Sequence, residues 1–305
     1  MIRTYLLAGR ENWICDRFVD EWNDSGLTYF LHRPTYADAL WLVAGWCWNQ
    51  VDPSYLASKP VIVTQHHIVP DKFDEVAWNL RDQFVDAYHV PCEKTRGQVA
   101  QHTSKPIYVI PFWANQHLWY PLDMNQSRAD LGLPEDACLV GSFQRDTEGS
   151  DLASPKLEKG PDIFCDIMEK MKVTHENLHV VLAGWRRQYV IGRLEAAGIP
   201  YTYLELPDAG VLNTLYNVLD LYIVSARHEG GPQAIVECAL TKTPIISTDV
   251  GMAGDLLARE SIYFSERNYD VAKPNTDVAY ENVRKLMIPE GMKPFKAMLE
   301  EVAAG

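Results

Sequence analysis

The chain has 305 residues, 47% of them hydrophobic, which is enough for two compact domains with buried cores. Its net charge of −13 argues against a nucleic-acid-binding surface, which needs clustered Lys and Arg, and against nonspecific attraction to anionic lipid. Six cysteines without a CxxC pair indicate a reducing compartment, with neither a disulfide framework nor a zinc site. Residues 1–4 show no signal-peptide pattern, and the apolar run 37–48 is too short to cross a bilayer. We therefore expect a cytoplasmic protein with at most peripheral membrane contact.

The N-terminal part alternates predicted strands with predicted helices. Strands are expected at residues 2–8, 27–31, 39–44, 60–65, 85–90 and 106–110, and helices at 11–22, 73–84 and 93–102. Such alternation predicts an α/β fold with a parallel sheet and right-handed crossovers. Ligands of these sheets collect at the carboxyl ends of the strands, where Gly9 and His66 fall.

The C-terminal part repeats this alternation after a linking segment. Strands are expected at 138–145, 179–184, 201–206, 221–225, 244–248 and 261–264, and helices at 162–171, 211–218, 232–241, 279–287 and 294–302. We therefore predict two Rossmann-like domains, residues 1–122 and 123–289, of which the first is the shorter.

Residues 219–257 carry the densest set of functional signals. A strand leads into a polar loop with two glycines, and Pro232 suits the first turn of the helix that follows. Glu229 lies in the loop and Glu237 on the second helical turn, near a helix N-terminus that favours anions. A carboxylate in so apolar a helix needs a partner. Glu237 therefore either pairs with a neighbouring Arg or Lys or binds a ligand.

The pattern S-x-x-x-EGGP-x-x-x-x-E, followed by PIISTDVG, resembles the nucleotide-sugar site of retaining glycosyltransferases with the GT-B fold, especially family 4 (glycosyl transferases group 1). The matching residues are Ser225, Glu229, Gly230, Glu237, Ala239, Pro244, Thr248, Asp249, Val250 and Gly251. The resemblance implies a GT-B architecture of two Rossmann-like domains with a shortened N-terminal domain. It also implies that the terminal helix, within residues 290–305, crosses back to complete the first domain.

The resemblance implies roles for this stretch. Glu237 would accept hydrogen bonds from the ribose hydroxyls, and Glu229 would hold hydroxyls of the transferred sugar. Gly230 and Gly231, followed by Pro232, would let backbone N–H groups approach the donor where a Cβ would obstruct it.

Basic residues earlier in the chain complete the implied donor site. Lys159, in a Lys-Gly pair, and Arg145 would neutralise the diphosphate of the donor. Arg145 departs from the family pattern because residues 142–144 separate it from the glycine it usually follows. Arg186 is a further candidate for phosphate, and Leu206, before the turn at 207–210, for the nucleotide base. The alternative is that these basic side chains are solvated surface residues.

In the N-terminal part, the string VIVTQHH resembles the family strand that ends in a histidine facing the transferred sugar, and His66 aligns with it. The alternative is an ordinary loop histidine. Residues 107–122 resemble the interdomain segment of the family. Their cluster of Trp113, Trp119 and Tyr120 forms either a sugar-stacking surface or, as we favour, packing between the domains.

We therefore predict a retaining glycosyltransferase that uses a UDP- or GDP-sugar and an unknown acceptor. Neither a metal nor a cofactor is expected, and the chain lacks the Asp-x-Asp motif of the other transferase fold. The alternative from another class is a catalytically silent GT-B module that binds sugar nucleotide or acts as a scaffold. An epimerase or phosphorylase on the same architecture ranks lower, and a DNA acceptor is disfavoured by the acidic charge. The sequence does not predict the oligomeric state.

Overall fold

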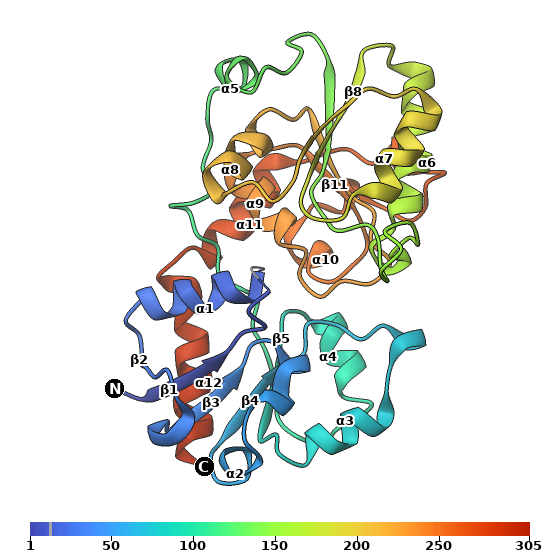
Figure 1. Ribbon diagram of the computed structural model, residues 1–305. Helices are drawn as coiled ribbons and strands as arrows, with labels where there is room; N and C mark the ends of the chain where they lie inside the picture. Colours follow the sequence, from blue (N-terminus) through green and yellow to red (C-terminus); the bar gives the residue numbers. More distant parts are fainter. Residues whose placement is uncertain (12–13) are drawn as a thin grey trace. The chain divides into compact units, whose positions relative to one another are not determined.

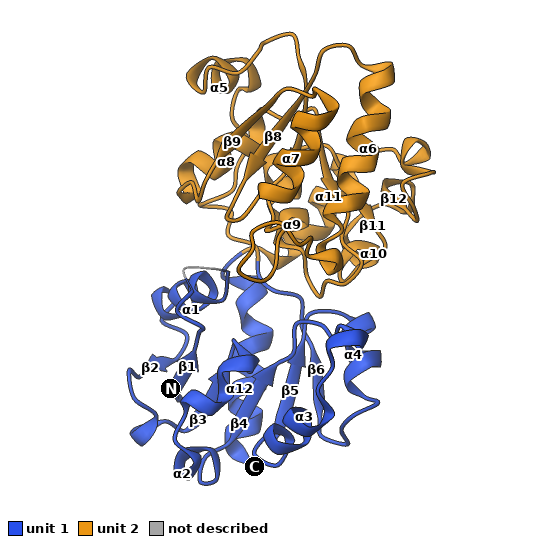
Figure 2. Cartoon of the chain, turned by 45° about the vertical axis from the view of Figure 1, so that its right-hand side comes forward, with its two compact units in different colours: residues 1–113, 288–305 blue, residues 114–287 orange. Residues whose placement is uncertain are grey.

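The computed structural model describes residues 1–11 and 14–305. The chain forms two compact units, which Figure 2 shows in blue and orange. Unit 1 comprises Met1–Trp113 and Ile288–Gly305, and unit 2 comprises Ala114–Met287. The C-terminal segment thus belongs to the same unit as the N-terminus, and the units divide earlier in the chain than the boundary at residue 122 taken from sequence.

Unit 1 is built on a six-stranded parallel sheet in the order β2-β1-β3-β4-β5-β6 (Figure 1). Its strands are β1 Arg3–Leu7, β2 Tyr29–Phe30, β3 Ala39–Leu42, β4 Val61–Thr64, β5 Ala87–Val90 and β6 Ile107–Val109. Strands β3, β4 and β5 are buried along their whole length, as expected for a parallel sheet covered on both faces. β2 is shorter than predicted because it pairs with β1 alone at the sheet edge.

Helices of unit 1 follow the strands in the predicted order. They are α1 Ile14–Asp24, α2 Pro53–Leu56, α3 Glu75–Asp82, α4 Glu93–Val99 and α12 Lys293–Ala304, with the 3-10 helices η1 Pro34–Tyr36, η2 Gly45–Gln50, η3 Pro70–Lys72 and η8 Glu290–Met292. Residues 12 and 13 of the predicted helix at 11–22 lie outside the described residues. α12 packs against β3 and β4, so the terminal helix completes the first unit, as the resemblance implies.

An aromatic cluster joins α12 to the sheet. The Phe295 ring lies 5.3 Å from that of Trp41 and 5.1 Å from that of Trp113, and all three side chains are buried. Trp119 is buried in unit 2 against Tyr216. A sugar-stacking surface of Trp113 and Trp119 is therefore excluded, because each ring packs inside its own unit. Tyr120 is the exposed member of the predicted cluster.

A series of hydrogen bonds between buried polar groups runs through the same core. Trp41 Nε1 donates to Thr64 Oγ1 at 2.9 Å, and Thr64 Oγ1 lies 3.0 Å from His89 Nδ1. His89 Nε2 is 2.8 Å from the Ile110 carbonyl, which makes it the donor. Burial lowers the pKa of His89 to about 3, so the ring is neutral in the folded protein.

Acid should therefore destabilise the protein through His89. Between pH 6.5 and about 3 the unfolded chain binds more protons at this residue than the folded chain, so stability falls as the pH drops through that window. His89→Gln removes the titration. Urea unfolding across this pH range should show the gap in free energy of unfolding between parent and variant narrowing toward low pH. A gap independent of pH would contradict the prediction.

Unit 2 contains the second six-stranded parallel sheet, in the order β12-β11-β10-β7-β8-β9. Its strands are β7 Cys138–Ser142, β8 Leu178–Ala183, β9 Tyr201–Leu204, β10 Leu221–Val224, β11 Ile245–Thr248 and β12 Ile262–Tyr263. β7 ends at Ser142, whereas the sequence predicted an end at Arg145. The backbone N–H of the next residue, Phe143, donates to the hydroxyl of Tyr222 instead of to a neighbouring strand.

Helices cover this sheet as they do the first. They are α5 Met124–Asp130, α6 Pro161–Thr174, α7 Gln188–Ala197, α8 Ala209–Asn217, α9 Gln233–Thr241, α10 Ala253–Leu256 and α11 Thr276–Val283, with η4 Leu157–Lys159, η5 Arg259–Ser261, η6 Tyr269–Val271 and η7 Arg284–Leu286. The two parallel α/β units have the arrangement of sheets and helices predicted from sequence.

All six cysteines are free, and five of them are buried. Among the described residues, no helix is both long and apolar enough to cross a membrane. Within the same part of the chain, no cluster of three or more His, Cys, Asp or Glu side chains could hold a metal ion.

Candidate functional site

Two loops of unit 2 are joined by backbone hydrogen bonds where β10 ends and α6 begins. The Glu158 carbonyl, in η4, accepts from the N–H groups of Arg227 at 2.9 Å and His228 at 3.0 Å. Ser225, the residue after β10, places its hydroxyl 3.5 Å from the Lys159 carbonyl. The Lys-Gly pair and the EGGP loop therefore lie side by side, although about 70 residues separate them in sequence.

Gly160 makes this approach possible. Its φ of +64° is left-handed, and a Cβ there would lie 1.8 Å from the Ser225 carbonyl oxygen. Any side chain would push the two loops apart. Glycine is thus required here for close backbone contact as well as for its conformational freedom.

We expect Gly160→Ala to destabilise the protein by roughly 3–4 kcal/mol, from the left-handed backbone and the steric overlap together. Gly132→Ala is the matched control, because Gly132 has a similar φ of +63° but no atom within 4 Å of the place a Cβ would take. It should lose only roughly 1–2 kcal/mol. Urea unfolding measures both, and equal losses would show that the Ser225 contact imposes no constraint.

The side chains of Lys159 and Glu229 form an ion pair across the joined loops. They are 13% and 15% exposed, so the pair is largely but not completely shielded from water. Arg227 and Asp162 form a second, two-pronged pair nearby, with distances of 2.7 Å and 2.6 Å. The cation predicted for the diphosphate and the carboxylate predicted for the sugar are thus in direct contact.

The glycine segment before α9 is held by the loop after β11. The Met252 N–H donates to the Gly230 carbonyl at 3.0 Å. A Cβ on Gly251, whose φ is +49°, would lie 2.0 Å from that same oxygen. Gly231 is half-buried, and Pro232 occupies the N-cap of α9, one residue before the position predicted. The match to the family at Gly251 therefore has a steric reason.

Glu237 lies on α9 and is only 5% exposed. Its Oε2 accepts a hydrogen bond of 2.6 Å from the Tyr216 hydroxyl. Burial, followed by the charge of Glu237, raises the pKa of Tyr216 well above its ordinary value, so the tyrosine is a neutral donor. Thr241, one turn further along α9, is buried too, and its hydroxyl donates to the Glu237 carbonyl.

Arg145 and Arg186 flank the indole of Trp185, which is 48% exposed after β8. Their guanidinium carbons lie 5.2 Å and 5.1 Å from the ring centroid. Arg145 also donates to the Thr147 carbonyl at 2.7 Å, and Arg186 donates to the Gly149 carbonyl. Both arginines therefore stabilise the loop that follows β7. Arg186 is only 7% exposed.

Arg187 is a structural residue that sequence reasoning missed. Its side chain is 1% exposed and pairs with equally buried Asp146 at 3.1 Å, where burial raises the pKa of the carboxyl despite the arginine. Arg187 also donates to the carbonyls of Ser142 and Ala183, at the ends of β7 and β8. The pair fixes the strand ends that support Arg145 and Trp185. Two adjacent arginines after a strand gave no sign of which one faces inward.

Leu206 extends the exposed surface at the end of the next strand. It follows β9, is 56% exposed and has a φ of +46°. Since β8 and β9 are neighbours, Trp185 and Leu206 are exposed apolar side chains at the same edge of the sheet. Asp208 caps α8 through the Val211 N–H at 2.9 Å, which sets the turn predicted at 207–210.

His66 and Gly9 lie in unit 1, at the carboxyl ends of β4 and β1 as predicted. His66 stacks on Phe112 with ring centroids 5.6 Å apart, and its Nε2 is 2.9 Å from the Val43 carbonyl. Cys15 Sγ lies 3.6 Å from the same nitrogen. Burial raises the pKa of the Cys15 thiol to about 12, so this Cys–His contact provides no nucleophile.

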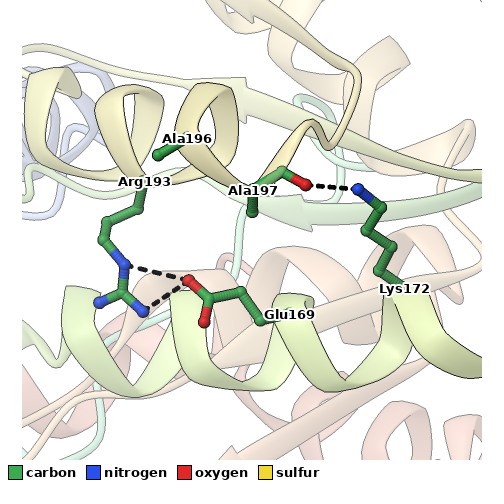
Figure 3. Close-up of a pocket in the computed structure, with 5 residues that line it drawn as sticks. All are labelled: Glu169, Lys172, Arg193, Ala196 and Ala197. Carbon is green, nitrogen blue, oxygen red and sulfur yellow. Dashed lines mark hydrogen bonds and ion pairs between the residues drawn. The ribbon is translucent and has the colours of Figure 1, made fainter.

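A hollow of about 340 Å³ lies between α6 and α7 (Figure 3). It is lined by Glu169, Lys172, Arg193, Ala196 and Ala197. Arg193 is bonded to Glu169 at 2.6 Å, and Lys172 donates to the backbone at the C-terminus of α7. These residues lie toward the ends of α6 and α7 that lead into β8 and β9. The hollow is therefore at the opposite edge of the sheet from the joined loops.

The fold and these loops define a class of protein. Residues 153–290 match the model of the family described as Glycosyl transferases group 1. The matched segment contains Lys159, Glu229 and Glu237, and the two units give the chain the GT-B architecture. The match covers somewhat less than half of the chain, and over these residues the chain resembles the group 1 glycosyltransferases.

The chain is also similar to a curated relative and to several solved structures. The lipopolysaccharide core biosynthesis mannosyltransferase LpsB of Rhizobium meliloti (strain 1021) is 25% identical over 171 residues, which cover 53% of this chain and 46% of the relative. The chain thus spans about half the length of that relative. Anabaena HepE in complex with UDP and glucose aligns over all of both chains, with a TM-score of 0.77 and 12% identity. Sucrose-phosphate synthase from Thermosynechococcus elongatus aligns over 95% of this chain and 79% of its own, with a TM-score of 0.70 and 16% identity. At such low identity these structures show a shared fold.

Proposed function

We propose that this chain is a retaining glycosyltransferase that moves a sugar from a nucleotide-diphosphate sugar to an acceptor hydroxyl. The observation that carries the proposal is the Lys159–Glu229 pair, which lies in a family-matching segment between two loops held together by Gly160. A cation and a carboxylate in one shielded position suit a ligand that carries both a diphosphate and sugar hydroxyls.

The donor would be held by elements at the carboxyl edge of the unit 2 sheet. Lys159 takes the diphosphate, with Arg145 as a second cation once it leaves its carbonyl partner. Glu237 takes the ribose hydroxyls from α9. The nucleotide base lies against the exposed side chains of Leu206 and Trp185. A UDP- or GDP-sugar fits this set, and the complexes of HepE with UDP and with UDP-glucose support UDP.

Transfer needs no nucleophilic side chain on this proposal. The bond from the anomeric carbon to the diphosphate oxygen breaks, and the acceptor oxygen bonds to that carbon on the same face. The acceptor proton passes to the departing phosphate oxygen. Lys159 stabilises the charge that grows on the diphosphate, and Glu229 orients the sugar through its hydroxyls. The two cations offset the diphosphate charge, so we propose a reaction without a metal ion.

Calorimetric titration with UDP-, GDP- and ADP-sugars tests the proposal, followed by transfer assays on a broad acceptor panel. We expect one nucleotide class to bind and to be consumed. If the folded protein binds no nucleotide, the donor site is refuted. Binding without hydrolysis or transfer would identify the chain as a silent sugar-nucleotide module. The free cysteines support a cytoplasmic location, which we also propose.

A further inference from the structure

Trp46 is an exposed aromatic residue at the carboxyl edge of the unit 1 sheet. It lies in η2, directly after β3, and is 53% exposed. The neighbouring strand β4 ends before His66, whose ring centroid is 5.9 Å from that of Trp46 at an interplanar angle of 51°. This is the edge at which parallel α/β sheets bind their ligands.

The backbone that carries Trp46 is held by tight packing. A Cβ on the preceding Gly45 would lie 2.8 Å from both the Thr64 carbonyl oxygen and Val63 Cγ1. Glycine therefore lets the η2 turn rest directly on β4. The indole is presented from a fixed base, so little chain entropy is lost when a ligand packs on it.

Arg81 ties the Trp46 loop to the His66 loop. This buried side chain donates to Gln65 Oε1 at 2.9 Å and contacts the Gly45 carbonyl at 3.5 Å. Its guanidinium carbon lies 4.6 Å from the centroid of the Trp78 ring. The residues immediately before Trp46 and His66 are thus linked by one buried cation, which holds the two rings at a set separation.

The electrostatic surroundings select among ligands. Burial, and then the carboxylates of Glu11 and Asp16, raise the pKa of the Cys47 thiol next to Trp46. The Asp16 carboxylate accepts hydrogen bonds from the backbone N–H groups of Arg10 and Glu11, which fixes the loop after β1. The Glu11 side chain is exposed. Carboxylates that act on Cys47, the residue after Trp46, disfavour an anionic ligand such as a phosphate and are compatible with an uncharged one.

We propose that Trp46 is a stacking platform for a sugar ring, so that unit 1 binds a carbohydrate. The apolar face of the pyranose packs on the indole, and the sugar hydroxyls stay at the edge of the ring, in contact with solvent. That this carbohydrate is the acceptor rests on the proposed function. The binding itself does not depend on it.

Fluorine NMR of the full chain labelled with 5-fluorotryptophan tests the proposal, because each of the nine tryptophans contributes one fluorine signal. The signal that is missing from the spectrum of Trp46→Phe is assigned to Trp46. The signal missing from that of Trp185→Phe is assigned to Trp185, which is also exposed. Neutral mono- and disaccharides should shift the Trp46 signal saturably and leave that of Trp185 in place. If no saccharide moves the Trp46 signal, or if saccharides move only that of Trp185, the proposal is overturned.

Variants complete the test by calorimetry. Trp46→Ala should lower the affinity for the best saccharide about tenfold or more, and Trp46→Phe should recover part of the loss. Tyr36→Ala is the control, because Tyr36 is 71% exposed in the same unit but lies in η1, before the start of β3. Equal saccharide affinity in Trp46→Ala and the parent would also overturn the proposal. Nucleotide titrations of the parent protein, run in parallel, separate this proposal from the proposed function. If the parent binds no nucleotide, the proposed function is refuted, but the saccharide binding at Trp46 is unaffected by that result.

Discussion

Replacing Glu229 by alanine is expected to lower the rate of sugar transfer by about 10²- to 10³-fold, since it removes a preorganised group at the reacting sugar. Affinity for the nucleoside diphosphate should persist or rise, because Lys159 loses its internal carboxylate partner and becomes free for phosphate. Transfer kinetics with the donor identified by titration, together with calorimetry of the diphosphate, measure both effects.

The reciprocal variant separates a catalytic pair from a structural one. Lys159→Ala should weaken diphosphate binding, which Glu229→Ala should not. If the two residues served only to hold the loops together, both variants would show the same loss of stability and the same kinetics. Arg227→Ala is the matched control, because it breaks the neighbouring Arg227–Asp162 pair without touching a predicted ligand. Transfer that survives in Glu229→Ala would assign Glu229 a structural role.

Glu237→Gln should weaken nucleoside diphosphate binding by about 10- to 100-fold, because hydrogen bonds to a charged acceptor are worth roughly 1.5–3 kcal/mol. Glutamine is a better test than alanine, since its amide oxygen can still accept from Tyr216, whose hydroxyl is buried. The measurement is calorimetry of the ribonucleotide against its 2′,3′-dideoxy form. The loss of affinity in Glu237→Gln should appear with the ribonucleotide and should be absent with the dideoxy form.

Tyr216→Phe supplies the control for this experiment. It removes the hydroxyl that bonds Glu237 and keeps the ring, so it should lower stability but change nucleotide affinity far less than Glu237→Gln. Equal weakening of the ribose and dideoxy ligands in Glu237→Gln would contradict direct contact with the ribose. Glu237 would then act by packing α9 against α8.

The sequence alone predicted the strands of the two parallel sheets and most of the longer helices, but it missed α7 and the short helices α2, α5 and α10. These features follow from local patterns, because buried apolar runs such as residues 61–64 and amphipathic helices are recognisable within a few residues. The resemblance to the glycosyltransferase family grouped Lys159, Glu229 and Glu237 in the second domain, and unit 2 contains all three. Gly160 belongs to that motif, and the steric reason for it came only from the fold.

The tertiary structure decided which side chains contact one another. Lys159 and Glu229 pair only because β10 and α6 bring two distant loops together. α12 returns to unit 1 because its apolar face, formed by Phe295, Met298 and Leu299, completes that core. Arg187 is buried because it forms an ion pair with Asp146, which lies in another loop. The same holds for Trp46, which is exposed beside His66 although the surrounding run 37–48 is apolar apart from Asp38. Local sequence encodes periodicity, whereas burial and pairing depend on residues far along the chain that the fold alone places next to each other.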